Sequence, residues 1–291
     1  MRFSPGVALQ YLLPQKLSCR FVYRISRSRR PWLRKLLIRG FIGLYDVDLG
    51  EAESDDIDAF ATFNDFFTRA LAPGARPLAG DDSIIACPAD GRLTEFGRLD
   101  ADRLLQAKGM SFTAGSLLGE TPELLERFHG GSFLTIYLAP HDYHRVHAPV
   151  AGQLDRCRYI PGRRFSVNLA TASAIDGLFC RNERAALWLS SNVGYAVVVM
   201  VGALNVSSLE TVLTGEIESG PERLVAPAVA PALARGEELG RFNLGIEGLA
   251  AHAAMGAPDR VGLATMGARP GVDLHRLRRL LRSRAIVRFA G

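Results

Sequence analysis

The stretch "GSFLTIYLAPHDYHRVHAPVAG", residues 131–152, changes character halfway along its length. Its first half is an apolar run rich in aromatic and β-branched residues, which predicts a buried strand. Its second half is bracketed by prolines and holds His141, His144 and His147. A loop that follows a buried strand often carries reactive side chains on a rigid support. The stretch therefore predicts a β-rich core and a candidate site at the end of one strand.

Similar strand-like runs lie on both sides of this stretch. Residues 83–99 read "SIIACPADGRLTEFGRL", and residues 195–215 read "YAVVVMVGALNVSSLETVLTG". Both combine short apolar runs with turn-forming residues. Helical patterns occur near the N-terminus and in residues 111–128, and they do not alternate regularly with the strands. The sequence therefore predicts an α+β fold, with a β-rich core of short, mostly antiparallel strands and N-terminal amphipathic helices.

The charge of the chain is unevenly distributed. The 291 residues carry a formal net charge of +5, and residues 1–45 hold ten Lys and Arg and no acidic residue. We expect this basic segment, residues 1–49, to form helices separate from the rest of the chain. The four cysteines lie far apart without C-x-x-C spacing. That pattern disfavours structural zinc and is typical of free thiols in a reducing compartment.

The second predicted helix of the N-terminal segment begins near Pro31. One predicted face of this helix carries Leu33, Leu36, Leu37, Phe41 and Leu44, with Arg34, Lys35 and Arg39 on its flanks. A basic amphipathic helix of this kind binds the headgroup layer of an anionic membrane, and each basic side chain contributes about 1 kcal/mol. An ordinary helix that packs on the core fits the pattern equally. Nucleic acid is disfavoured because no nucleic-acid-binding motif accompanies the arginines.

The three histidines suit proton transfer better than metal binding. In an extended chain His141 and His147 share one face and His144 points to the other, and no H-E-x-x-H pattern is present. A metal-dependent hydrolase is therefore disfavoured. Histidine titrates near neutral pH, and in proton transfer it is usually oriented by a carboxylate and acts on a hydroxyl or thiol. Asp90 in "PADG" is the candidate carboxylate, although aspartate in a tight turn also caps its own backbone.

Several longer motifs occur in a fixed order around these residues. They are "FNDFFTRAL" with "RPL" (63–78), "PADG" (88–91), "QAKGMSF" (106–112), "YLAPHDYHRVHAPVAG" (137–152), "YIPG" with "FSVN" (159–168), "FCRNER" (179–184), "VGALNVSSLETV" (201–212) and "GEELGRFNLG" (236–245). In this order the chain resembles the bacterial phosphatidylserine decarboxylases, over roughly residues 8 to 245. The resemblance implies three parts: membrane-associating helices in 1–49, the β-chain core in 50–245 and, in 246–291, a divergent tail in the place of the α chain.

The resemblance implies a specific chemistry. Members of this family are proenzymes that cut themselves at the Gly-Ser bond of an L-G-S-T motif, and the serine becomes a covalent pyruvoyl group. The pyruvoyl carbonyl forms a Schiff base with phosphatidylserine, which then loses CO2 to give phosphatidylethanolamine. Asp90 and His147 match the first two members of the family's Asp-His-Ser triad. His144 matches the histidine that handles substrate and returns a proton after CO2 leaves.

The resemblance also implies partners and a location. The family works on phosphatidylserine at the cytoplasmic face of the cell membrane, as a peripheral protein on an anionic surface. Processing yields an α and a β chain that remain associated, and a homodimer is suggested. No metal and no nucleic acid are implied.

The chain departs from the family's L-G-S-T motif at the position of the serine that starts the reaction. Gly245 is followed by Ile246 and Glu247, where the family has serine and threonine. Isoleucine has no hydroxyl, so it cannot attack the preceding carbonyl, and we expect this chain to be uncut, inactive and without the pyruvoyl group. The tail 246–291 is rich in Ala, Gly and Arg and has little strand character.

Two explanations compete for this break. One is a homologue that has lost the reaction and remains a non-catalytic, lipid-binding peripheral membrane protein. The other is a reading-frame or assembly error after Gly245, which the abruptness of the change favours.

Overall fold

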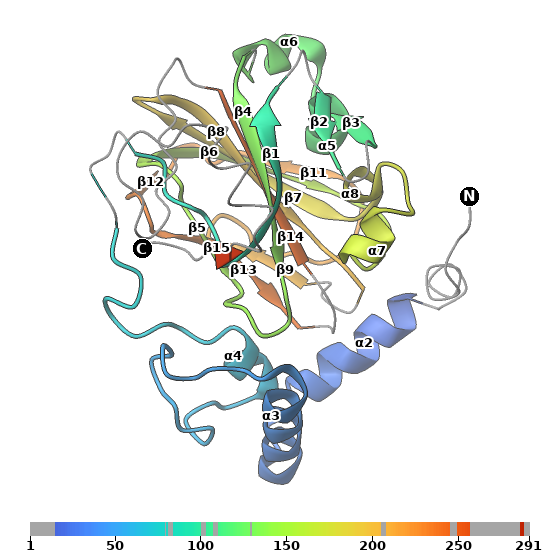
Figure 1. Ribbon diagram of the computed structural model, residues 1–291, viewed down its shortest axis with the longest axis vertical. Helices are drawn as coiled ribbons and strands as arrows, with labels where there is room; N and C mark the ends of the chain where they lie inside the picture. The colour runs from blue at the N-terminus through green and yellow to red at the C-terminus, as the bar shows by residue number, and fades with distance from the viewer. Residues whose placement is uncertain are drawn as a thin grey trace.

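The computed structural model describes residues 15–78, 80, 84–99, 103–106, 110–128, 130–204, 208–244, 249–256 and 286–287. Two helices lead from the N-terminus into a body made mostly of strands (Figure 1). The described helices are α2 (Gln15–Ser26), α3 (Pro31–Tyr45), α4 (Phe63–Phe67), α5 (Ala114–Leu118), α6 (Pro122–Leu125), α7 (Leu169–Ala172), α8 (Leu178–Arg181) and the 3₁₀ helix η1 (Glu126–Phe128).

The strands of the described residues form one large sheet and two small ones. The large sheet has the order β11 (Arg223–Val225), β6 (Gly152–Ile160), β7 (Arg184–Ser191), β8 (Gly194–Val201), β14 (Leu249–Gly256), β4 (Ser132–Leu138), β1 (Gly91–Arg98) and β15 (Ile286–Val287), and β12 (Ala232–Leu233) also pairs with β6. A second sheet has the order β10 (Gly215–Glu216), β9 (Ser208–Thr211), β13 (Glu238–Asn243) and β5 (Arg145–His147), and β2 (Arg103–Leu105) pairs with β3 (Ser111–Thr113). The ladders between these strands are antiparallel, which confirms the predicted α+β class.

Strand β4 confirms the prediction made from residues 131–152. Successive side chains of a strand point to opposite faces of the sheet. Leu134, Ile136 and Leu138 accordingly belong to one buried apolar cluster, and Phe133 belongs to another on the opposite face. The large sheet is therefore covered on both faces at β4, and the histidine-bearing loop leaves directly from its buried end.

Helix α3 confirms a helix after Pro31, but its buried face differs from the predicted one. Ile38 and Phe41 are buried, whereas Leu36 and Leu44 are 62% and 74% exposed. The helix is rotated toward Ile38 because the aromatic side chains of α4 pack there, around Phe41. One apolar side of α3 therefore meets the core, and another faces outward.

Two other segments differ from the sequence expectation. The helix expected in 111–128 is divided into α5, α6 and η1, because Gly119 adopts a left-handed conformation (φ 65°) that ends α5. The tail also contains a strand, since β14 pairs with β8 on one side and β4 on the other. Its low strand propensity is overridden by two neighbouring strands that each offer a free edge.

Candidate functional site

Strand β5 brings the predicted site residues into one region. The backbone N–H of His147 donates to Pro88 O at 2.8 Å, two residues before Asp90. On its other side β5 pairs with β13, whose chain continues to Leu244. The turn with Asp90, the histidine loop and the end of β13 are thus neighbours. Gly245 and Ile246 lie outside the described residues.

Asp90 is a buried carboxylate, 5% exposed, at the start of β1. Arg76 Nη2 and Nε donate to Asp90 Oδ2 at 2.9 and 3.2 Å. The next residue has to be glycine, because a Cβ on Gly91 would lie 2.5 Å from Tyr137 O. The "PADG" turn therefore presses its backbone against β4 and holds the carboxylate beside a guanidinium.

Arg76 connects Asp90 to an acidic linker, the stretch "GEAESDDIDAF" of residues 50–60. Its Nη2 also lies 2.5 Å from Glu51 Oε2, and its Nη1 donates to Ala75 O at 2.8 Å. Desolvation opposes the charged form of Arg76, but hydrogen bonds with Glu51 and Asp90 outweigh it and raise the pKa of the guanidinium. The acidic linker thus supplies a second carboxylate for a buried arginine.

Substituting Arg76 by methionine is expected to destabilise the protein by about 3 kcal/mol, because removing one partner of a buried ion pair leaves its charged partner poorly compensated. The free energy of unfolding in urea measures this loss. If the ion pair is the cause, Asp90→Asn combined with Arg76→Met costs less than the sum of the two single substitutions. Strict additivity would contradict this account.

His147 has a defined tautomer. Its Nδ1 lies 2.8 Å from Gly236 O and its Nε2 lies 3.1 Å from Tyr143 Oη. Since a carbonyl oxygen only accepts, Nδ1 carries the proton, and Nε2 offers the lone pair that accepts from the phenol. Desolvation lowers the pKa of His147, although the bond to Gly236 partly opposes this shift. The ring is therefore a neutral base at neutral pH.

Tyr143 reinforces this state of His147. Burial raises the pKa of its phenol to about 12, so the hydroxyl remains a donor. The two rings are nearly parallel, with centroids 5.6 Å apart. The Tyr143 ring therefore packs on the His147 ring, and its hydroxyl donates to the lone pair of His147 Nε2.

His144 is 1% exposed and lies on the other side of the loop. Its ring stacks on Phe67, with centroids 3.9 Å apart and an interplanar angle of 16°. Nε2 donates to Pro140 O at 3.1 Å, while Nδ1 is a buried atom without a hydrogen-bond partner. Desolvation lowers the pKa of His144 to about 3. His144 Nδ1 is therefore a buried acceptor without a hydrogen-bond partner, in a ring that packs on an apolar side chain.

The third histidine is separate from this arrangement. The side chain of His141 is 51% exposed, and its Nε2 lies 3.6 Å from Asp142 Oδ1. Asp142 also accepts the backbone N–H of Ala139 at 2.6 Å, which shapes the start of the loop. The structure thus brings Asp90 and His147 into one region, buries His144 and leaves His141 at the surface.

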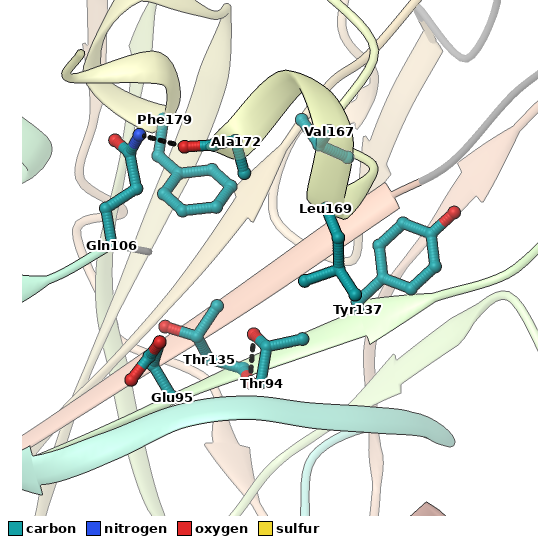
Figure 2. Close-up of a pocket in the computed structure, with 9 residues that line it drawn as sticks. All are labelled: Thr94, Glu95, Gln106, Thr135, Tyr137, Val167, Leu169, Ala172 and Phe179. Carbon is teal, nitrogen blue, oxygen red and sulfur yellow. Dashed lines mark hydrogen bonds between the residues drawn. The ribbon is translucent and has the colours of Figure 1, made fainter. Parts of the chain in front are cut away.

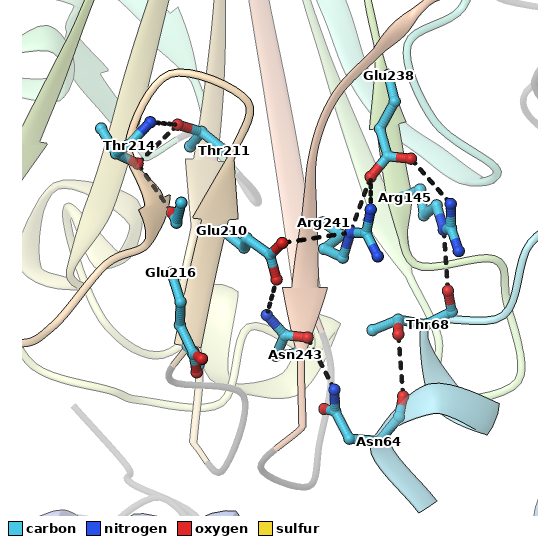
Figure 3. A network of polar contacts seen from close by, with 12 residues as sticks. Asn64, Thr68, Arg145, Glu210, Thr211, Thr214, Glu216, Glu238, Arg241 and Asn243 are labelled. Atoms are coloured by element: carbon cyan, nitrogen blue, oxygen red, sulfur yellow. Dashed lines mark hydrogen bonds and ion pairs between the residues drawn. The ribbon is translucent and has the colours of Figure 1, made fainter. Parts of the chain in front are cut away.

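A polar network ties the end of β13 to α4 and β5 (Figure 3). Glu238 accepts from Arg145 at 2.9 Å and from Arg241 at 2.8 Å. Asn243 donates to Glu210 at 2.8 Å and accepts from Asn64 at 2.9 Å. The residues just before Gly245 are therefore held by side chains from several parts of the chain.

A pocket lies between strands β1 and β4 and helices α7 and α8 (Figure 2). Its walls are formed by Thr94, Glu95, Gln106, Thr135, Tyr137, Val167, Leu169, Ala172 and Phe179. Burial raises the pKa of Glu95. Apolar walls with a few polar groups are usual for small-molecule sites. Since Tyr137 pairs with Ala250, the pocket adjoins the strand that follows the Gly245–Ile246 junction.

Sequence reasoning missed Tyr143, Arg76 and Phe67. Tyr143 stands inside the histidine motif and Phe67 inside "FNDFFTRAL", so both motifs carried a signal that was not assigned to particular side chains. Arg76 stands in the same motif, as the first residue of "RPL", and was likewise not assigned a role. Its role depends on Glu51 and Asp90, which lie 25 and 14 residues away.

Comparisons with known proteins support the family resemblance that the order of the sequence motifs indicates. The family model described as phosphatidylserine decarboxylase matches residues 63–246, and a model described as PSD matches residues 5–46. A phosphatidylserine decarboxylase proenzyme of Alkalilimnicola ehrlichii is 47% identical over 244 residues, which cover 82% of this chain and 84% of the relative. The Pseudomonas aeruginosa proenzyme is 45% identical over 245 residues, with 82% and 85% covered.

Proposed function

The chain belongs to the phosphatidylserine decarboxylase family, and we propose from this premise that this copy is an uncut form of an enzyme that converts phosphatidylserine to phosphatidylethanolamine and CO2. The proposal of an uncut state rests on one observation, the isoleucine at position 246. The surrounding groups support the lineage, because a neutral His147, a buried Asp90 and a buried His144 are all present. What is missing is the nucleophile.

The residues of this chain do not fit the pyruvoyl group of the family. That group is made from a serine, and Ile246 has neither a hydroxyl nor any atom that can replace it. His147 Nε2 can accept a proton, but no hydroxyl at position 246 is present to give one. We therefore assign no decarboxylation step to the chain as it stands.

Intact mass under denaturing conditions tests this proposal. We expect a single species of 31.6 kDa and no release of CO2 from phosphatidylserine vesicles. Two chains, the smaller with a blocked amino terminus, would overturn it.

The tail has two explanations with different consequences. The family match ends at residue 246, which supports a reading-frame or assembly error at this point. A homologue that has lost the reaction would keep the same sequence in an unbroken frame and act as a non-catalytic, lipid-binding protein. Resequencing codons 240–250 separates the two, because an unbroken frame with isoleucine at 246 excludes the error.

We also propose that α2 and α3 hold the protein on an anionic membrane surface. The outer side of α3 carries Trp32, Leu36 and Leu44, each more than 60% exposed, and Phe21 of α2 is 67% exposed. Arg39 is exposed beside them. Among the described residues, no helix is long and apolar enough to cross a bilayer. Apolar side chains beside basic ones are the combination that binds an anionic interface.

Replacing Trp32, Leu36 and Leu44 together by serine is expected to weaken binding to anionic vesicles by about 100-fold or more, since three large apolar side chains contribute roughly 3 kcal/mol or more when they enter the lipid. Vesicle sedimentation at two salt concentrations measures this, and high salt should also weaken binding of the unaltered chain.

Val229→Ser is the matched control, because Val229 is 85% exposed and lies outside both helices. This variant should bind as the unaltered chain does. Equal binding by the control and the triple variant would exclude α3 as the membrane contact.

A further inference from the structure

Helix α4 belongs to the motif "FNDFFTRAL", which the proposed chemistry does not use. Thr62 and Asp65 form reciprocal side-chain to backbone hydrogen bonds that cap its first turn. Three aromatic residues of α4 then pack in an apolar cluster that consists of Ile38, Phe41, Val47, Phe63, Phe66, Phe67 and Leu244. Leu244 is 1% exposed and immediately precedes Gly245. A short, capped helix is therefore fixed against the last described residue before the junction.

The polar side of α4 contacts the same residue. Asn64 Oδ1 accepts the backbone N–H of Leu244 at 2.9 Å, and Asn64 Nδ2 donates to Asn243 Oδ1 at 2.9 Å. Asn64 is 8% exposed and Asn243 is 2% exposed. One amide side chain thus holds both residues that lead into Gly245.

Asn64 is itself held in place from two directions. Thr68 Oγ1 donates to Asn64 O at 3.0 Å, and Asn243 is anchored to Glu210 at 2.8 Å (Figure 3). Arg145 of the histidine motif donates to Thr68 O at 2.9 Å. The amide of Asn64 therefore has a defined orientation toward Leu244.

We propose that Asn64 is a positioning residue for self-cleavage, which acts by holding Leu244, the residue before Gly245. This inference rests on the proposed function, since it assumes that the family's cut falls between Gly245 and position 246. In the family a serine hydroxyl attacks the Gly245 carbonyl, and such an attack requires the reacting atoms to be aligned. The same helix stacks on His144 through Phe67, so α4 contacts both the histidine loop and Leu244.

The first test uses the full chain as it exists and does not depend on cleavage. Asn64→Ala removes both the acceptor for the Leu244 N–H and the donor to Asn243 Oδ1, whereas Asn64→Asp retains the acceptor and loses only the donor. Hydrogen exchange of the Leu244 amide, followed by NMR, should become at least about 10-fold faster in Asn64→Ala and stay within about 3-fold in Asn64→Asp, because a buried hydrogen bond limits local opening. Unchanged exchange in Asn64→Ala would overturn the proposal.

The second test measures cleavage in a chain that carries Ile246→Ser, Glu247→Thr and a family-like tail. Asn64→Ala should slow cleavage by about 100-fold, the scale expected for misplaced reacting groups. Asn64→Asp should restore it to within about 5-fold of the parent on the same scale. Equal losses in both variants, or no loss in Asn64→Ala, would overturn the positioning role.

Asn182→Ala separates positioning from general stability. Asn182 is fully buried and holds the backbone of Phe165 and Gly202 through its side chain, away from α4. At a temperature where both variants are folded, it should leave Leu244 exchange and cleavage near the parent values. If Asn182→Ala slows cleavage as much as Asn64→Ala, the effect is one of stability and the proposal fails. A parent that does not cut at all contradicts the proposed function instead, and the exchange test still decides the role of Asn64.

Discussion

A chain with Ile246→Ser, Glu247→Thr and a family-like tail is expected to cut itself into two chains, where the unaltered protein gives one species of 31.6 kDa. The reason is chemical. The serine supplies the missing nucleophile, and His147 is a neutral base whose acceptor nitrogen is already defined by the bond to Gly236. The family's other matching residues, Asp90, His147 and His144, are already present in the chain.

Intact mass and denaturing electrophoresis measure this change, and hydroxylamine traps the ester that precedes it. The matched control is the same tail with valine at position 246, which is similar in shape to isoleucine and also lacks a hydroxyl. It should remain a single chain. Cutting in the valine control, or the absence of cutting with serine over many hours, would mean that position 246 does not decide the reaction.

The sequence predicted the scaffold better than it predicted the contacts of the site. An uninterrupted run of β-formers is a local signal, so β4 and the loop after it could be read directly. The partners of His147 are different, because Gly236 lies 89 residues away in the chain. No local pattern indicates that this carbonyl will set the tautomer. Candidate residues could therefore be named, but their protonation could not.

The distinction between local signals and long-range contacts also explains why the buried face of α3 and the strand in the tail differ from the sequence expectation. In α3 the sequence contains apolar residues around most of the helix, so periodicity alone cannot select the side that meets α4. In the tail, "LAAHAAMG" is a weak strand former, yet the adjacent edges of β4 and β8 impose extended backbone on it. In both cases a tertiary contact decides, and that contact is encoded elsewhere in the chain.

In the chain that cuts itself, His147→Ala is expected to slow cutting by at least about 100-fold, which is the usual contribution of a general base. The structure gives Nε2 as the atom that takes the proton, since Nδ1 donates to Gly236. Because desolvation lowers the pKa of His147 from 6.5, the ring stays neutral at pH 7 and above. The cutting rate should therefore be flat there and fall as acid protonates the ring.

His144→Ala is the matched variant, and we expect it to affect CO2 release rather than cutting. The ring of His144 stacks on Phe67 and keeps an unused acceptor at Nδ1, whereas His147 has both ring nitrogens engaged by Gly236 and Tyr143. A group that acts after cutting should leave the two chains to form and lower CO2 release by about 100-fold. If both variants block cutting equally, the two histidines share one role. A chain that still cuts at the parent rate with His147→Ala would show that the proton leaves by another base.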